Sequence, residues 1–279
     1  MKSIIFKIIG KFGYQIKKKH PVDVYIISFP KCGRTWLNLI IGKYFEQYIG
    51  LYGIDNDLAL NLNLLFDLFP DALRNVVFSH DENPNFFRLP EQLKTNKKKY
   101  KKSKIIFLTR DPRDVIVSSY FEKTKRIGLG NRRSSWKSFD GTMSDYVYQK
   151  HGGIDSIIRF YNIWGENREV PTDFLLLKYE DLLTDTEVQF ERLLKFIDLK
   201  IDKLMIKKAV EAASFKNMEK IERSGGTKSD KLKPFDINDK DSYKTRKGII
   251  GDHKNHLLNE EIEYLTKKIE NDLSDYFGY

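Results

Sequence analysis

Six residues that favour a buried strand, 24–29, lead directly into a loop that opens a helix. Apart from one serine they are apolar, β-branched or aromatic, which is typical of a parallel strand covered on both faces. The loop, 30–36, reads Pro-Lys-Cys-Gly-Arg-Thr-Trp, and apolar residues at helical spacing follow it. A helix N-terminus presents free backbone N–H groups and a partial positive charge. With Lys31 beside it, we expect this loop to bind a phosphate or a sulfate.

The rest of the chain alternates strands with helices, which predicts an α/β fold with a central, mostly parallel sheet flanked by helices. Further strands are expected at 75–80, 105–109 and 174–179. Helices are expected at 55–69, 112–120, 143–164 (interrupted at Gly152-Gly153), 184–197, 201–213 and 259–273. Asp111 is placed to cap the helix at 112–120, and Pro112 is the first residue of that helix.

We find no repeat or linker that would divide the chain, so residues 21–279 are expected to form one domain. Residues 1–20 form a separate basic segment, with six lysines, no acid, and isoleucines that would share one helical face. This segment either touches an anionic membrane surface weakly or docks on its own domain. The polar stretch 223–244 is expected to be a long loop or lid, and the basic run 97–104 a solvated approach to a strand.

The formal net charge is +10, which favours anionic ligands such as nucleotides, phosphate, sulfate, nucleic acid or an acidic membrane. Cys32 is the single cysteine, so the chain cannot form an internal disulfide. A reducing compartment fits this composition, and we expect a cytoplasmic protein. No apolar run approaches the ~20 residues of a spanning helix, and no signal-peptide pattern is present at the N-terminus.

Two enzyme classes fit the first loop poorly. A nucleoside-triphosphatase loop needs G-x-x-x-x-G-K-[ST], whereas here Lys31 precedes the glycine and Cys32 stands where a magnesium-binding Ser or Thr would follow the lysine. Cys32 at a helix start suggests a thiolate nucleophile, as in some phosphatases. Such an enzyme would need an arginine six residues later, and Asn38 stands there. Cys32 is therefore interpreted as a small loop residue.

Two more stretches carry anion-binding groups. Arg110 leaves a buried strand and Ser118 lies two turns into the next helix, so a guanidinium and a hydroxyl could hold a second phosphate. An ion pair between Arg110 and Asp114 explains this arginine equally well. Near the C-terminus, Arg246 and Lys247 precede a glycine and could close over an anion, although a basic surface turn has the same composition.

Together with two shorter motifs, these stretches resemble the sulfotransferases that use 3′-phosphoadenosine-5′-phosphosulfate (PAPS), in particular their cytosolic small-molecule branch. Residues 29–36 resemble the family's Y-P-K-S-G-T-T-W loop, and 110–118 its R-N-x-x-D-x-x-x-S motif. Residues 179–182 match Y-E-D-L, 214–218 match S-F-x-x-M, and 246–255 resemble R-K-G-x-x-G-D-W-K-N. The five motifs occur in the family's order along most of the chain.

The resemblance implies one α/β domain with a P-loop-like loop for the phosphosulfate, PAPS as donor, adenosine 3′,5′-bisphosphate (PAP) as product, and no metal. It implies catalytic roles for His80 as general base and for Lys31 beside the leaving oxygen. A lone histidine near a strand end is otherwise most often structural. The cofactor-binding residues implied are Lys31, Cys32, Gly33, Arg34, Thr35, Trp36, Arg110, Ser118, Tyr179, Ser214, Phe215, Met218, Arg246, Lys247 and Gly248.

The chain departs from the family pattern at several positions. Cys32 and Arg34 replace hydroxyl residues of the first loop, and His253 replaces a tryptophan. Phe78 and Ser79 stand where relatives carry Lys-Thr before the catalytic histidine, so the family's second catalytic lysine is missing there. The dimerisation stretch K-x-x-x-T-V-x-x-x-E is not matched after Lys254, which leaves the oligomeric state open.

The acceptor is expected to be a small molecule with a hydroxyl or an amine, bound between the stretches 81–90, 144–154 and 223–244. Candidate wall residues are Phe86, Phe87, Tyr146, Tyr148 and Tyr243. Asp81, Glu82, Asp145 and Asp155 could receive a cationic acceptor, although surface solvation explains each of them. The alternatives are a sugar or glycolipid acceptor, a P-loop-type phosphotransferase, and a nucleic-acid-binding module, for which no recognised motif is found.

Overall fold

The computed structural model describes residues 20–82, 84, 89–126, 139–225, 227, 229–234 and 236–279. Nearly all of the basic N-terminal segment lies outside these residues, as do the candidate acceptor residues Phe86 and Phe87.

A parallel sheet forms the centre of the fold. Its strands are β1 (Val24–Ser28), β2 (Val76–Ser79), β3 (Lys104–Thr109) and β4 (Asp173–Lys178). They pair in the order β2-β1-β3-β4, and every pairing is parallel. The α/β prediction is therefore confirmed, and each predicted strand is present within one or two residues of its expected bounds.

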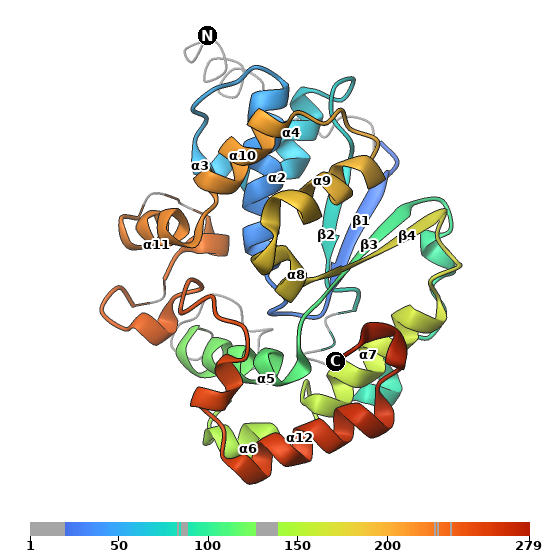
Figure 1. The fold of residues 1–279 in the computed structure, drawn as a ribbon, viewed down its shortest axis with the longest axis vertical. Helices are drawn as coiled ribbons and strands as arrows, with labels where there is room; N and C mark the ends of the chain where they lie inside the picture. Colours follow the sequence, from blue (N-terminus) through green and yellow to red (C-terminus); the bar gives the residue numbers. More distant parts are fainter. Residues whose placement is uncertain are drawn as a thin grey trace.

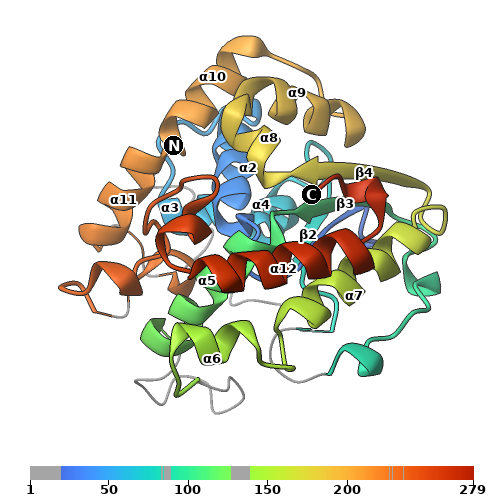
Figure 2. The same cartoon turned by 60° about the horizontal axis from the view of Figure 1, so that its bottom comes forward.

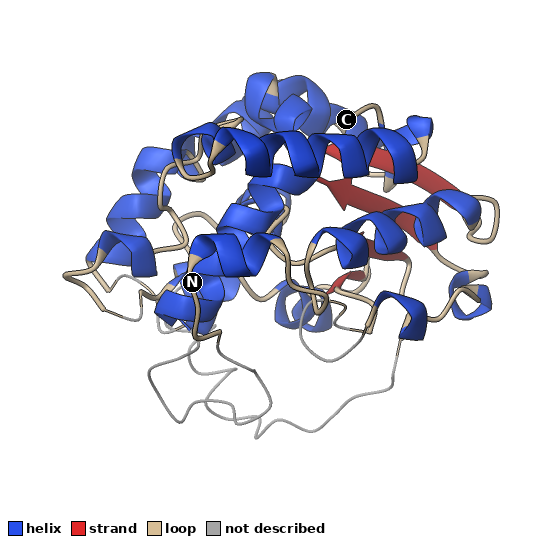
Figure 3. Cartoon of the chain, turned by 90° about the horizontal axis from the view of Figure 1, so that it is seen from below, coloured by secondary structure: helices blue, strands red, loops and turns tan. Residues whose placement is uncertain are grey.

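Helices cover both faces of this sheet. On one side lie α2 (Arg34–Tyr48), α8 (Tyr179–Thr184), α9 (Thr186–Phe196) and α10 (Lys203–Ala212), and on the other α7 (Ile154–Glu166) and α12 (Asn259–Asp272) (Figures 1 and 2). Figure 3 shows the strands lying among these helices. Phe107 of β3 packs against Phe160 and Trp164 of α7, which closes the core on that side.

Five further α-helices lie within the described residues. They are α3 (Asn56–Ala59), α4 (Leu62–Leu68), α5 (Pro112–Phe121), α6 (Met143–Val147) and α11 (Phe215–Arg223). Asp111 caps α5 as predicted, since its Oδ1 accepts a hydrogen bond from the backbone N–H of Arg113 at 2.9 Å. In the part of the chain that the structure describes, no helix is long and apolar enough to cross a membrane.

Three details of the sequence interpretation were incomplete. The helix expected at 55–69 is two helices, because Asn61 caps α4 by accepting from the backbone N–H of Leu64. Helices α8 and α11 were not predicted, although Ser214 is the N-cap of α11. The lid stretch contains two short 3₁₀ turns, Asp230–Leu232 and Lys240–Ser242.

The basic run 97–104, which was predicted to be solvated, is partly buried. The prediction was wrong for Lys97. Its side chain is 3% exposed and lies 2.6 Å from Asp81 Oδ2. Lys99 and the Tyr100 hydroxyl contact Asp81 Oδ1, both at 2.8 Å. The carboxylate of Asp81 is thus buried and fully engaged, which removes it from the candidate contacts for a cationic acceptor.

Candidate active site

A cleft opens where the four parallel strands end. After β1 the chain enters the 30–36 loop, after β2 it reaches His80, after β3 Arg110, and after β4 Tyr179. The chain crosses from one side of β1 to the other between β2 and β3, and such a switch point forms a crevice at the carboxyl edge. The cleft is lined by Pro30, Lys31, Gly33, Arg34, Thr35, Trp36, His80, Arg110, Ser118, Glu122, Tyr179, Leu183, Phe215, Met218, Lys244, Thr245, Arg246, Lys247, Gly248, Ile249 and Asp252.

The N-terminus of α2 faces this cleft without a side-chain cap. Its N-cap is Gly33, whose φ of 88° is in the left-handed region that favours glycine. A Cβ at Gly33 would lie 2.5 Å from Cδ2 of Tyr179, so the ring packs directly on the loop backbone. Because no side chain of the N-cap accepts from the first turn, its N–H groups are available to an anion.

Lys31 lies at the start of this loop with a φ of 77°, and its Nζ contacts Glu122 Oε2 at 2.6 Å. Arg126 pairs with the same carboxylate oxygen at 3.2 Å. Burial opposes ionisation of Glu122, but Lys31, Lys244 and Arg126 outweigh it and hold the pKa of this carboxyl well below its usual range. Burial lowers the pKa of Lys31, although Glu122 opposes that shift.

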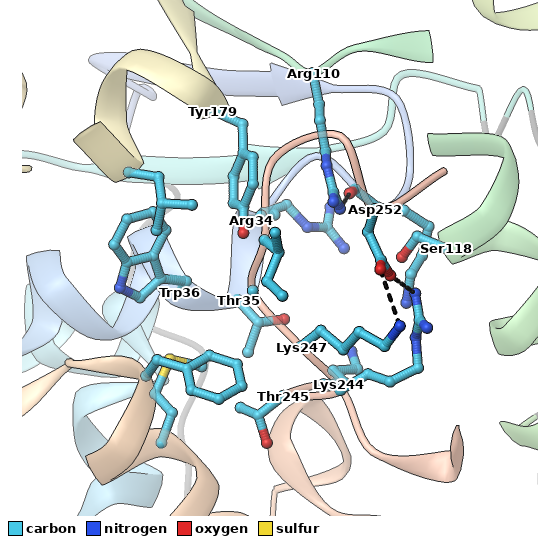
Figure 4. Close-up of a pocket in the computed structure, with 18 of the residues that line it drawn as sticks. Arg34, Thr35, Trp36, Arg110, Ser118, Tyr179, Lys244, Thr245, Lys247 and Asp252 are labelled. Atoms are coloured by element: carbon cyan, nitrogen blue, oxygen red, sulfur yellow. Dashed lines mark hydrogen bonds and ion pairs between the residues drawn. The ribbon is translucent and has the colours of Figure 1, made fainter. Parts of the chain in front are cut away.

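A second group of cations lies along the other wall (Figure 4). Arg246 and Lys247 contact the two oxygens of Asp252, at 3.0 and 2.9 Å. Arg110 Nη2 lies 3.5 Å from Asp114 Oδ2, so the expected ion pair exists, yet Arg110 also lines the cleft and its buried Nε has no hydrogen-bond partner within the described residues.

Asp114 connects the two basic motifs. Its carboxylate accepts hydrogen bonds from the backbone N–H groups of Gly251 and His253, at 2.9 and 3.0 Å, and from Nδ1 of His253 at 2.9 Å. This buried carboxylate on α5 therefore fixes the loop that carries Arg246 and Lys247 beside Arg110. The histidine that replaces the family's tryptophan takes part in this connection.

Aromatic side chains form the opposite end of the cleft. Trp36 and Tyr179 lie edge to face, with ring centroids 5.9 Å apart, and Figure 4 shows them on the side of the cavity away from Lys247 and Asp252. The guanidinium of Arg110 lies over the Tyr179 ring at 4.5 Å. Phe215 and Met218 of α11 line the same region, and a Cβ at Gly248 would lie 2.6 Å from Phe215.

His80 is presented to the cleft in a defined tautomer. Its Nδ1 lies 2.9 Å from the carbonyl oxygen of Ser28. Because a carbonyl only accepts hydrogen bonds, Nδ1 carries the proton and Nε2 is left as an acceptor. Burial, reinforced by the positive charge of Arg34, lowers the pKa of His80 well below 6.5, so the ring is neutral at pH 7. This is the state that a general base requires.

Comparison with known protein families matches residues 21–277 to the family described as sulfotransferase domain. The chain belongs to the sulfotransferase family. Cytosolic sulfotransferase 7 of Arabidopsis thaliana is 26% identical over 252 residues, which are 85% of this chain and 74% of that protein.

Solved structures of sulfotransferases share the fold. Mouse sulfotransferase SULT7A1 complexed with PAP gives a TM-score of 0.56 at 19% identity, covering 92% of this chain and 87% of that one. Retinol dehydratase in a complex with retinol and PAP gives a TM-score of 0.63 at 18% identity, covering 92% of this chain and 83% of that one.

Most of the site residues expected for this sulfotransferase meet in the cleft. Those that line it are Lys31, Gly33, Arg34, Thr35, Trp36, His80, Arg110, Ser118, Tyr179, Phe215, Met218, Arg246, Lys247 and Gly248. Cys32 does not line it: the side chain is buried with Sγ 3.4 Å from the Tyr161 hydroxyl, and burial raises the pKa of the thiol to about 12. Ser214 is also absent from the lining and instead caps α11.

The three described candidates for the acceptor wall lie elsewhere. Tyr146 is 0% exposed and packs in the core against Tyr120. Tyr148 is exposed and packs against Tyr264. Tyr243 is buried, and its hydroxyl donates to the carbonyl of Ile237 at 2.7 Å. None of these three lines the cleft, so the structure gives no support to their expected role.

Seven lining residues are not among the predicted site residues: Pro30, Glu122, Leu183, Lys244, Thr245, Ile249 and Asp252. Pro30, Ile249 and Asp252 lie within the sequence motifs named above, whereas the other four lie outside them. Glu122 lies four residues after Ser118, on the same face of the helical segment, and this spacing could have indicated it. Lys244 and Thr245 directly precede Arg246, so their position beside a basic motif was also available. Nothing in the sequence indicated that Glu122 pairs with Lys31, 91 positions away.

Proposed function

We propose that this sulfotransferase uses PAPS as donor and transfers its sulfuryl group to a hydroxyl or an amine of a small organic molecule. The observation that carries the proposal is that a neutral His80 with a free Nε2 lines the same cleft as Lys31 and the uncapped N-terminus of α2. This arrangement supports a reaction in which a base and a cationic leaving-group site share one cavity.

The charge of the cleft supports a polyanionic donor. Six basic residues and two carboxylates line it, so the excess reaches four positive charges when Lys244 is protonated and His80 is neutral. PAPS carries about four negative charges when its phosphate monoester is counted as roughly −2. The orphaned Nε of Arg110 and the close contacts at Gly33 and Gly248 also fit a ligand whose phosphates approach the backbone.

The two anionic ends of the donor are assigned to the two basic regions. We assign the 3′-phosphate to Arg110, Ser118, Arg246, Lys247 and the backbone at Gly248. The 5′-phosphosulfate is assigned to Lys31, Thr35 and the first turn of α2. The aromatic surface formed by Trp36, Tyr179, Phe215 and Met218 lies between α2 and α11 and suits a purine ring.

In the proposed reaction, bound PAPS supplies an electrophilic sulfur with the bisphosphate as leaving group. Nε2 of His80 removes the acceptor's proton as the new bond to sulfur forms. The sulfur–oxygen bond to the 5′-phosphate breaks, and the electron pair leaves on the phosphate oxygen. Lys31 and the N–H groups of α2 stabilise that charge, so the tightening of their contacts in the transition state lowers the barrier.

The acceptor class follows from the family and not from particular contacts. Related proteins are named for flavonol, hydroxysteroid and amine substrates, and one solved relative holds retinol. These are small molecules with a hydroxyl or an amine. A sugar or glycolipid acceptor remains the second candidate, because the basic N-terminal segment could bring the enzyme to an anionic surface.

The proposal is tested by incubating the protein with labelled PAPS and pooled metabolites, and by thermal shift with PAP, PAPS, ATP–Mg²⁺ and DNA. We expect label transfer to small molecules and stabilisation by PAP and PAPS. Stabilisation by ATP–Mg²⁺ without any response to PAP would contradict the proposal in favour of a phosphotransferase. Binding of DNA alone, with a steep salt dependence, would favour a nucleic-acid-binding protein.

A further inference from the structure

Two of the six cations that line the cleft lack a carboxylate partner. Arg34 and Lys244 form no hydrogen bond or ion pair through their side chains with any residue that the structure describes, whereas the other four do. Those four are Lys31 with Glu122, Arg110 with Asp114, and Arg246 and Lys247 with Asp252. Cations that are partly buried without a partner are costly, and this cost is recovered when an anion binds between them.

The backbone that carries Lys244 is firmly held. The N–H groups of Lys244 and Thr245 donate to the Glu222 carboxylate at 2.8 and 3.0 Å, and the Thr245 hydroxyl donates to it at 2.7 Å. Glu222 is 1% exposed, and Arg126 compensates its charge at 3.3 Å. Because the carboxylate binds the backbone and not the amine, the Lys244 side chain stays available to the cleft that it lines.

Lys244 and Arg34 line the same cleft as His80, and their charges act on it. Burial is the main cause of the lowered pKa of His80, and the charges of Arg34, Lys244 and Lys31 add to it. Burial also lowers the pKa of Lys244 to about 7, opposed by Glu122 and reinforced by Arg126, Lys31 and Arg34. These cations are therefore close enough to influence one another and the base, with Glu122 as the compensating carboxylate.

We propose that Lys244 binds a non-bridging oxygen of the transferred sulfuryl group, with Arg34 as the second cation at that group. This inference rests on the proposed function, because it assigns a contact to the donor named there. This contact gives the two cations a role beside the base. They hold the sulfur in line between Nε2 of His80 and the leaving oxygen at Lys31. They also neutralise charge that would repel an approaching acceptor oxygen.

An anionic acceptor, such as a carboxylate, could satisfy the same two cations. We favour the donor because the sulfuryl group must lie between Lys31 and His80 for an in-line transfer, and a chain of contacts ties Lys244 to the Lys31 side of the cleft. The backbone of Lys244 binds Glu222, which pairs with Arg126 at 3.3 Å. Arg126 in turn lies 3.2 Å from Glu122, the partner of Lys31. Measuring the binding of PAPS without any acceptor distinguishes a contact with the donor from a contact with the acceptor. A contact with the sulfuryl group changes the affinity for PAPS and not for PAP, which lacks that group.

The experiment measures the dissociation constants of PAPS and PAP, without acceptor, for the wild type, Lys244→Met, Lys244→Arg and Lys240→Met. Lys240 is an exposed lysine in the same segment and serves as the matched control. We expect Lys244→Met to weaken PAPS about tenfold or more, the size of one hydrogen bond to a charged group, with little change for PAP. Lys244→Arg should restore most of the loss, and Lys240→Met should resemble the wild type.

A second readout is the pH dependence of kcat/KM for PAPS. A lysine binds an anion when it is protonated, so this parameter should fall as pH rises through the Lys244 pKa, which is about 7 in the free protein. In Lys244→Arg the alkaline decline should move to higher pH, since a guanidinium stays charged. Equal losses for PAPS and PAP in Lys244→Met, or a rise confined to the KM of the acceptor, would overturn the inference. Neither result would affect the proposed function, which fails only if the wild type does not use PAPS.

Discussion

Nδ1 of His80 lies 2.9 Å from the carbonyl oxygen of Ser28, which is the last residue of the neighbouring strand β1. The strand that leads into the 30–36 loop thus also sets the tautomer of His80. One strand end therefore orients both the proposed base and the loop to which we assign the leaving group. A single backbone segment fixes these two parts of the proposed site relative to each other.

Replacement of His80 by alanine should reduce kcat by ~10²–10⁴, the usual contribution of a general base. The dissociation constant of PAP should stay close to that of the wild type, because the assigned phosphate contacts come from other residues. Turnover with labelled PAPS and calorimetric titration with PAP measure these two quantities. Near-normal turnover in His80→Ala would remove this residue from the mechanism.

On the acid side, the pH dependence of kcat/KM should report the protonation of His80. Burial lowers the pKa of His80 below 6.5, and the base works only when it is neutral. kcat/KM should therefore persist below pH 6.5 and decline only as pH falls through the lowered pKa. A profile measured from pH 5 to pH 8 tests this, and an acid limb centred above pH 6.5 would contradict it. In His80→Ala the residual activity should lack this limb.

Substitution of Glu122 by glutamine removes a carboxylate that pairs with Lys31 at 2.6 Å. Breaking a buried ion pair lowers the free energy of unfolding by up to about 3–5 kcal/mol. Because this pair keeps some exposure, we expect the free energy of unfolding of Glu122→Gln to fall by about 1–3 kcal/mol. PAP should then raise the Tm by more than it does in the wild type, since it supplies the missing negative charge. Glu219→Gln, which breaks an exposed pair with Arg223, is the control. An unchanged Tm in Glu122→Gln would show that the pair has no net effect on stability.

Alanine at Gly33 should abolish PAP binding and destabilise the fold. The backbone there has a φ of 88°, and the added Cβ would lie 2.5 Å from the Tyr179 ring. Gly225→Ala is the matched control, because that glycine also has a positive φ, 63°, but among the described residues beyond its chain neighbours no atom lies within 4 Å of the position that a Cβ would take. Thermal melts with and without PAP compare the two variants. Equal effects in both would mean that the packing of Tyr179 on the loop is unimportant.

Cys32 should be dispensable for catalysis. Its thiol is buried against Tyr161, and burial raises its pKa to about 12, so it is not a nucleophile at neutral pH. Cys32→Ala should keep a kcat near the wild-type value, with some loss of stability from the small cavity. Native protein should also resist alkylation by iodoacetamide. Loss of turnover in a folded Cys32→Ala variant would reopen the nucleophile hypothesis.

The sequence by itself determined the α/β class, the four strands and the main candidate anion-binding groups. These follow from local signals: a continuous apolar run predicts a buried strand, and a loop of lysine and glycine at a helix start predicts an anion site. Parallel strands end at the same edge, so the residues after them, Lys31, His80, Arg110 and Tyr179, are brought together by the topology alone.

Only the tertiary structure decided the remaining features. Three of them depend on contacts between segments distant in the sequence: Lys97 is buried against Asp81, Tyr146 lies in the core and not at the cleft, and Glu122 pairs with Lys31. The position of Lys244 likewise depends on Glu222, which binds its backbone and not its amine. Residue type and spacing do not predict such pairings. The energy of a buried charge depends on the partners that the fold places around it, and those partners come from distant parts of the chain.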